Sequence, residues 1–203
     1  MTTSAEPGHE QPIINMTGDN IALGPFHRGI LPFFFRWFND FTFNILSGDL
    51  ATPVTPEDVE AEYERCTKGT DRFDFIIYEH ASLRPIGITN LRDIDKRHLT
   101  AELGIGIGER GCWGKGYGTE ATSLVLDFGF TALGLHNIIL DPLSFNERAI
   151  RTYRRVGFKE IGRRREAYRI GNRAYDLVLM DCLSTEFKPL AKRAIELPEE
   201  RVP

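Results

Sequence analysis

The sequence predicts an α+β fold in which one mostly antiparallel sheet of about seven strands is flanked by about four helices. Seven segments carry strand patterns, namely residues 21–23, 73–78, 85–91, 99–107, 136–140, 158–168 and 173–183. The second, third and fourth of these follow one another with only short polar turns between them, which is typical of an antiparallel meander. The last two flank a tight turn at Gly171-Asn172 and predict a hairpin.

Helix signals lie between the first strand and the meander. Thr55 and Asp58 form a capping box around Pro56, and this pattern predicts a helix that ends near Thr67. The aromatic-rich residues 31–43 are predicted to be a helix followed by a loop. Because one helix has only one buried stripe, some of these rings should line a cleft or a subunit contact.

Two more helices are predicted in the second half of the chain. One begins at Thr119-Glu120 and presents apolar residues at helical spacing. The other is capped by Ser144 or by Asn146 and ends at Gly157, which is a favourable residue after a helix. With the two helices above, these make four.

The composition is that of one globular domain with a core of ordinary size. The chain has 203 residues, of which 41% are hydrophobic and 27% are charged. We expect a flexible tail at residues 1–12, one domain at 13–184, and a charged tail at 185–203 with a loosely docked helix at 190–197. The formal net charge of -4 gives no electrostatic reason to bind nucleic acid.

The cysteines and the apolar runs limit the cellular context. Cys66, Cys112 and Cys182 are far apart and follow no disulfide or metal spacing, so we expect free thiols and no metal. The chain contains no long apolar run, and its first residues lack the order of a signal peptide. These features predict a cytoplasmic protein with no membrane partner.

The most informative segment is residues 101–131, in which an apolar strand runs through a glycine-rich loop into an amphipathic helix. Its glycines include Gly106, Gly108, Gly111, Gly114, Gly116 and Gly118. Uncovered backbone at a helix N-terminus brings several N–H groups to the positive end of the helix dipole. The segment therefore predicts a binding site for a phosphate or a pyrophosphate.

Two common phosphate motifs fit this loop poorly. The P-loop pattern is nearly met at Gly114-Lys115, but Gly116 stands where a hydroxyl is needed and Glu109 where the first glycine is needed. Residues 106–111 match G-x-G-x-x-G, yet the third glycine does not open a helix. A dinucleotide-binding fold should also alternate strands and helices from its start.

A third pattern combines W-G-K-G-Y-G-T-E-A at residues 113–121 with N-E-R-A at 146–149, Tyr153 and Gly157-Phe158. Over residues 20–183 this combination resembles the GNAT superfamily of N-acetyltransferases, and within it the branch of ribosomal-protein alanine and spermidine acetyltransferases. The resemblance implies a splayed sheet and a coenzyme A site at the glycine loop. Trp113 stands where the superfamily usually has Gln or Arg, so contact there would be through the backbone.

The resemblance also implies which residues hold acetyl-CoA. The pyrophosphate would meet the loop, and the pantetheine arm would follow the strand before it. The implied residues are Ile105, Gly106, Ile107, Trp113, Gly114, Lys115, Gly116, Tyr117, Gly118, Thr119 and Asn146. Tyr153 would lie near the thioester sulfur and protonate the leaving thiolate, although its spacing also fits a buried aromatic.

Acyl transfer to an amine also needs a proton acceptor. Glu102, on the nearly bare face of the strand before the loop, is the first candidate, although it could equally bind only the acceptor ammonium. Ser144, His136 and Asp141 are weaker candidates. An acyl-cysteine route through Cys112 is disfavoured because no motif gives that thiol a basic partner.

Charge is distributed unevenly along the chain. Residues 40–64 contain seven acids and no Lys or Arg, whereas residues 147–173 contain ten Lys or Arg and three acids. A basic flank suits an anionic cofactor and an acidic, aromatic flank suits a cationic amine, although two solvated faces would look the same. The expected acceptor-binding residues are Phe34, Trp37, Asp40 and Glu102.

The sequence thus predicts an acetyl-CoA-dependent N-acetyltransferase that acts by direct attack in a ternary complex. The expected acceptor is a primary amine of a polyamine, an aminoglycoside-like molecule or a protein N-terminus. A homodimer is plausible from the surplus of aromatic residues. The alternatives are a non-catalytic acyl-CoA-binding module and, with less support, a dinucleotide-dependent oxidoreductase.

Overall fold

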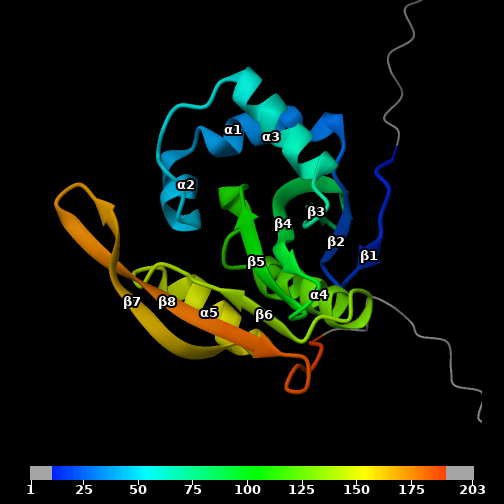
Figure 1. Cartoon of the computed structure of the whole chain (residues 1–203). Helices are drawn as coiled ribbons and strands as arrows, with labels where there is room; N and C mark the ends of the chain where they lie inside the picture. Colours follow the sequence, from blue (N-terminus) through cyan, green and yellow to red (C-terminus); the bar gives the residue numbers. More distant parts are fainter. Residues whose placement is uncertain (1–10, 191–203) are drawn as a thin grey trace, which may run out of the picture.

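A computed structural model describes residues 11–190, in which one eight-stranded sheet carries helices on both faces (Figure 1). The strands are β1 (Met16–Thr17), β2 (Ile21–Pro25), β3 (Phe73–Glu79), β4 (Arg84–Asp95), β5 (Thr100–Ile107), β6 (Asn137–Leu140), β7 (Lys159–Ile170) and β8 (Arg173–Leu183). The α-helices are α1 (Leu31–Phe38), α2 (Phe41–Ser47), α3 (Pro56–Lys68), α4 (Tyr117–Thr131) and α5 (Glu147–Val156). Short 3-10 helices lie at Arg28–Ile30 (η1) and Arg110–Cys112 (η2).

The strand order is β1-β2-β3-β4-β5-β6-β8-β7, and β5–β6 is the parallel pair in this sheet of residues 11–190. That pair is short, because its register runs only from Thr100–Asn137 to Glu102–Ile139. Beyond Glu102, β5 continues to Ile107 with β4 as its strand neighbour on one side alone. The sheet is therefore splayed between β5 and β6, as the family resemblance implied.

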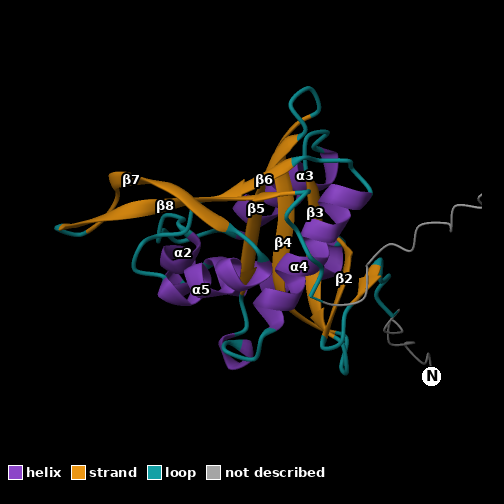
Figure 2. Ribbon diagram, turned by 90° about the horizontal axis from the view of Figure 1, so that it is seen from below, coloured by secondary structure: helices purple, strands orange, loops and turns teal. Residues whose placement is uncertain are grey.

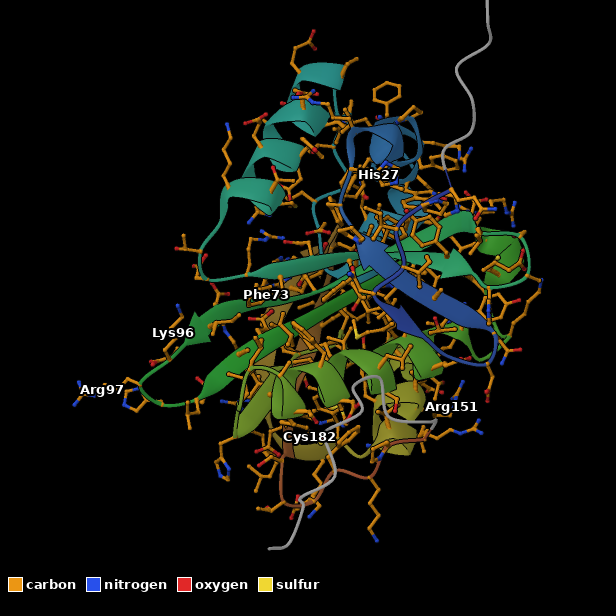
Figure 3. All side chains as sticks on the ribbon, turned by 90° about the vertical axis from the view of Figure 1, so that its right-hand side faces the viewer. His27, Phe73, Lys96, Arg97, Arg151 and Cys182 are labelled. Atoms are coloured by element: carbon orange, nitrogen blue, oxygen red, sulfur yellow. The ribbon has the colours of Figure 1, made fainter. Side chains whose placement is uncertain are left out.

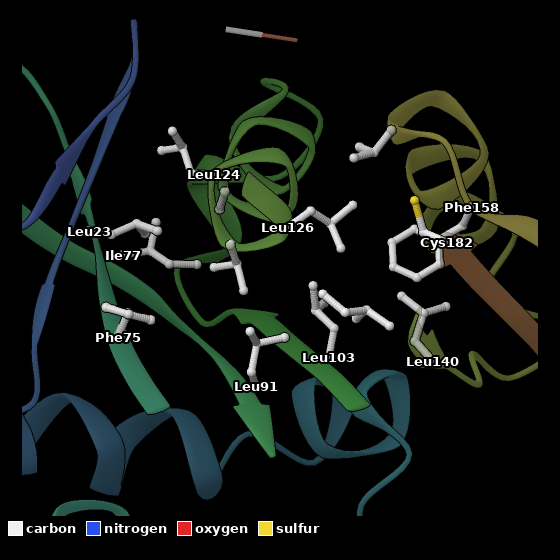
Figure 4. Packing of buried hydrophobic residues seen from close by; sticks show 14 of the residues in the cluster. Leu23, Phe75, Ile77, Leu91, Leu103, Leu124, Leu126, Leu140, Phe158 and Cys182 are labelled. Atoms are coloured by element: carbon white, nitrogen blue, oxygen red, sulfur yellow. The ribbon is translucent and has the colours of Figure 1, made fainter. Parts of the chain in front are cut away.

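The two faces of the sheet have separate cores. On one face, α4 inserts Leu124 and Leu126 against Leu23, Ile77 and Leu91 of the strands (Figure 4). The opposite face packs against α1, α2 and α3, through residues that include Ile30, Phe34, Trp37, Phe43, Val59, Ile76 and Tyr78. The β7–β8 hairpin extends away from this body in both ribbon views (Figures 1 and 2).

The predicted fold class is confirmed, and the differences are local. The short β1 raises the strand number to eight, and the aromatic segment forms two helices where a helix and a loop were expected. Asp40 starts the second of these, because its carboxylate accepts hydrogen bonds from the N–H groups of Thr42 and Phe43. Some rings of the aromatic segment are exposed and others are buried, as expected because each helix has one buried stripe.

The predicted caps are largely confirmed. The Thr55–Asp58 capping box opens α3, and Asn146, not Ser144, caps α5 by accepting a hydrogen bond from the Ala149 N–H. α4 begins two residues earlier than predicted, because the left-handed Gly116 already ends the loop. The mostly antiparallel sheet is not doubly wound, which contradicts the dinucleotide-dependent oxidoreductase.

Two expectations concern the chain ends. The tail expected at residues 1–12 lies largely outside the described residues, as does the helix expected at 190–197. Within residues 11–190, Phe187 stacks on Phe130 of α4 and the Leu190 N–H donates to the Ser123 hydroxyl, so packing continues past residue 184. No helix in this described range is long and apolar enough to cross a lipid bilayer.

Gly108 is a position where the fold has no room for a side chain. A Cβ there would lie 2.3 Å from ring atoms of the buried Trp37. We therefore expect Gly108→Ala to lower the free energy of unfolding by about 1–3 kcal/mol through overpacking. Gly111→Ala is the control, since nothing lies within 4 Å of its Cβ position. Equal midpoints for the two variants in urea would contradict this packing.

Candidate functional site

Two cavities meet at the free edge of β5. The glycine-loop cavity, of about 350 Å³, is bounded by this edge, the loop before α4, and α5. The acidic cavity, of about 510 Å³, lies between the sheet and the α2–α3 region and reaches Tyr168 on the hairpin. The residues that line both are Phe43, Leu46, Ser47, Ile105, Gly106, Asn146, Ala149 and Tyr153.

The loop before α4 presents bare backbone to the first cavity. Gly114 and Gly116 are left-handed, with φ of 77° and 86°, and nothing lies within 4 Å of either Cβ position. From Gly114 to Thr119, no main-chain N–H donates to any group in residues 11–190, and no side chain caps α4. These N–H groups lie at the positive end of a 15-residue helix, so the loop is suited to an anion.

Three arginines of α5 face the same cavity. Arg148, Arg151 and Arg155 line it, and the Arg148 guanidinium lies 4.4 Å from the centre of the Trp113 ring. The Trp113 indole N–H donates to the Ile107 carbonyl at 2.7 Å, which fixes the ring at the end of β5. The spacing of three and four residues between these arginines indicates, from the sequence alone, that they share one helix face.

The structure places the predicted cofactor residues together. All of them line the glycine-loop cavity except Lys115, whose ammonium lies over the Tyr117 ring instead. Asn146 lies at the junction of the two cavities, but its side-chain amide already makes hydrogen bonds to other residues of the protein. It caps α5, and it also donates to the Leu46 carbonyl at 3.0 Å, which ties α2 to α5.

Tyr153 lies where the two cavities join. Its ring packs against Phe158, and it lines both cavities. Burial, with a smaller contribution from the negative charge of Asp141, raises the pKa of Tyr153 to about 12. The hydroxyl is therefore protonated at neutral pH and able to donate a proton.

The floor of the acidic cavity comes from paired residues of β4 and β5. Asn90 lies opposite Gly104, and Arg92 lies opposite Glu102 and forms an ion pair with it. A Cβ at Gly104 would come within 2.7 Å of the Asn90 Oδ1 atom, so the side chains of Asn90 and Arg92 already occupy the space that a larger residue would need. Phe43 covers Gly106 in the same way, so the face of β5 that was predicted to be nearly bare is covered at both glycines by neighbouring side chains.

The acidic cavity carries more negative than positive side chains. Its lining carboxylates are Asp49, Asp58, Glu62, Glu102 and Asp141, and its lining guanidinium groups are Arg65, Arg72 and Arg92. Arg65 bonds to Glu62, and Arg72 forms a buried ion pair with Asp74. Burial raises the pKa of both Asp49 and Asp141, so a cationic ligand would favour their ionised forms.

Of the residues expected to bind an acceptor, Phe34 and Glu102 line the acidic cavity, whereas Trp37 and Asp40 line neither cavity. Trp37 is buried and its indole N–H donates to Glu109. Asp40 caps α2 and pairs with Arg110. The segment is aromatic and acidic, as the sequence indicated, but the side chains of Trp37 and Asp40 stabilise the fold.

The weaker candidates for the proton acceptor differ in whether they line a cavity. Asp141 lines the acidic cavity, whereas Ser144 and His136 line neither cavity. His136 lies at the opposite end of β5, where its N–H donates to the Leu99 carbonyl. Cys112 lines the glycine-loop cavity as a buried thiol, with Arg84 as a hydrogen-bond neighbour at 3.7 Å.

Sequence comparison identifies relatives of one kind. The profile of the family described as "Acetyltransferase (GNAT) domain" matches residues 21–159. The chain is 33% identical to the spermidine N(1)-acetyltransferase of Escherichia coli K12 over 111 residues, which are 51% of this chain and 59% of that protein. It is 30% identical over 117 residues to the uncharacterized N-acetyltransferase p20 of Bacillus licheniformis, covering 58% and 64%. The chain thus spans about three fifths of the length of these curated relatives.

A solved structure resembles nearly the whole described fold. The spermidine N-acetyltransferase of Vibrio cholerae, crystallised in complex with CoA and spermine, superposes with a TM-score of 0.77 at 26% identity. The match covers 82% of this chain and 97% of that one. The two chains therefore share the splayed fold that forms the cavities.

The arginines of α5 can be tested with a simple anion. We expect pyrophosphate to raise the melting temperature, and Arg151→Gln to weaken its binding by about tenfold, since hydrogen bonds to charged groups contribute substantially. The control is Arg97→Gln, because Arg97 lies on the β4–β5 turn, well separated from Arg151 (Figure 3). Equal weakening in both variants, measured by calorimetric titration, would mean that only net charge matters.

Proposed function

Because the chain belongs to the GNAT acetyltransferase family, we propose that it transfers an acetyl group from acetyl-CoA to a primary amine of a small polycation of the polyamine kind. The observation that carries this proposal is the junction of two cavities of opposite character at Tyr153. One cavity offers N–H groups and arginines, and the other carries more carboxylates than guanidinium groups. Acyl transfer from an anionic thioester to a cationic amine needs both.

The glycine-loop cavity fits acetyl-CoA. The N–H groups of Gly114 to Thr119 would hold its pyrophosphate, and the arginines of α5 would meet its phosphates. The free edge of β5 at residues 105–107 would bind the pantetheine arm through main-chain groups, as a missing strand would. Bound there, acetyl-CoA supplies an activated acyl group.

Tyr153 and Glu102 have different tasks in this proposal. Tyr153, whose hydroxyl is protonated at neutral pH, gives its proton to the thiolate as the carbon–sulfur bond breaks. Glu102, held by Arg92 on the cavity floor, binds the acceptor ammonium. The excess of carboxylates in the acidic cavity supports an acceptor with more than one positive charge.

Removal of the Tyr153 hydroxyl tests the acid role. Tyr153→Phe should lower kcat by about 10²–10³-fold, because general acid catalysis contributes on this scale. The affinity for coenzyme A should change little, since the proposed anion site lies in the loop and α5. Tyr175→Phe is the control, because Tyr175 lines neither cavity and its ring packs against Phe145. An unchanged kcat for Tyr153→Phe would remove Tyr153 from the mechanism.

An acceptor panel tests the reaction itself. With acetyl-CoA and detection of free thiol, we expect kcat/KM for spermidine or spermine to exceed that for butylamine or for peptides with a free N-terminus, since the acidic cavity favours multiple charges. The second candidate function is a non-catalytic acyl-CoA-binding module. Stabilisation by acetyl-CoA without thiol release for any amine would favour that module instead.

A further inference from the structure

Asp141 occupies a position on the acceptor side of the site that the proposed chemistry above leaves unused. The parallel register ends where Ile139 pairs with Glu102, and Asp141 follows two residues later, just past the end of β6, where the two strands separate. Asp141 shares the lining of the acidic cavity with Glu102 and Gly104. Asp141 and Tyr153 both line the acidic cavity.

The surroundings of the two neighbouring carboxylates differ. Glu102 is committed to an ion pair with Arg92. Asp141 makes no ion pair within residues 11–190. The charged groups that act on Asp141 are Glu102 of β5, Arg92 of β4 and Arg164 of β7, and its own charge acts on Tyr153 of α5.

We propose that Asp141 is a further catalytic residue, which accepts the proton of the attacking amine, directly or through one water, while Tyr153 protonates the leaving thiolate. This inference rests on the proposed acetyl transfer. The bound ammonium first loses one proton to solvent, the neutral amine nitrogen then forms a bond to the thioester carbon, and the carbon–sulfur bond breaks. The N–H proton passes to Asp141, the Tyr153 proton passes to sulfur, and each group then exchanges its proton with solvent. One proton is released for each ammonium consumed.

A carboxylate can accept this proton because the amine N–H becomes far more acidic as its bond to the carbonyl carbon forms. Burial first, and then the charge of Glu102, raise the pKa of Asp141 above that of an ordinary aspartate, which makes it a stronger base. Because only the ionised form accepts a proton, kcat/KM should fall as the pH falls through this raised pKa. In this assignment Glu102 binds the acceptor ammonium, and Asp141 accepts the proton of the attacking amine.

The first test compares Asp141→Asn with Asp49→Asn. Asp49 lines the same cavity and burial raises its pKa too, but no charge contribution from it to Tyr153 is present. With spermidine, Asp141→Asn should lower kcat about 10²-fold at neutral pH, and the loss should shrink at high pH as hydroxide and free amine take over. Asp49→Asn should affect KM more than kcat. Equal losses of kcat in both variants would overturn the assignment, as would a pH profile of Asp141→Asn that matches the wild-type profile.

The pH profile supplies a second readout that a structural role would not move. Glu102→Gln removes a negative charge that raises the pKa of Asp141, so the acid limb of kcat/KM should move to lower pH. Arg164→Gln removes a positive charge that lowers it, so the limb should move to higher pH. Shifts in the same direction, or no shifts, would contradict Asp141 as the titrating base.

A measurement without acetyl transfer separates this inference from the proposed function. The charge of Asp141 contributes to the high pKa of Tyr153, so Asp141→Asn should lower the midpoint of one tyrosine in an alkaline absorbance titration, and Asp49→Asn should not. If that midpoint moves but no amine releases thiol in the wild-type protein, the proposed function fails while the effect of the Asp141 charge on Tyr153 stands. If thiol is released and the midpoint does not move, Asp141 is not beside Tyr153 and this inference fails.

Discussion

The early end of the β5–β6 pairing is the constraint on which the site depends. The two parallel strands share only three residue pairs, and after Glu102 they separate. An unpaired strand edge inside a protein leaves main-chain groups without partners, which is costly unless a ligand or water meets them. The splay therefore creates a slot with hydrogen-bonding walls, and both cavities open onto it.

The slot is held open by contacts that cross the sheet. α4 and α5 pack on one face, and α1 to α3 pack on the other (Figure 1). Asn146 joins these layers, because one side-chain amide both caps α5 and bonds to α2. This amide therefore links two elements that belong to different cores at the junction of the cavities.

Charge divides the site into two halves. The glycine loop and the arginines of α5 give one half a positive field, and the carboxylates of the α2–α3 region, of β5 and of the residue after β6 give the other a negative field. Tyr153 lies at the boundary, where burial keeps its hydroxyl protonated. Two substrates of opposite charge would therefore be drawn into different cavities and meet at one hydroxyl group.

The sequence by itself determined the fold class, the hairpins, the caps of α3 and α5, and the glycine loop, because these depend on local periodicity and on residues with special backbone preferences. It also identified the family, since two motifs at fixed spacing carry that information. It missed the second aromatic helix, because a cap by Asp40 within an aromatic run gives a weak signal.

Only the tertiary structure decided which side chains face the slot. Trp37 and Asp40 looked suited to a ligand, yet burial and a cap assign them to the fold. Asp141 was one of several weaker candidates and Arg148 and Arg151 were only part of a basic flank, yet the packing of α5 and the end of β6 brings them to the cavities. The reason is physical: the spacing of residues within one element is local, but the partner that a side chain meets depends on how separate elements pack.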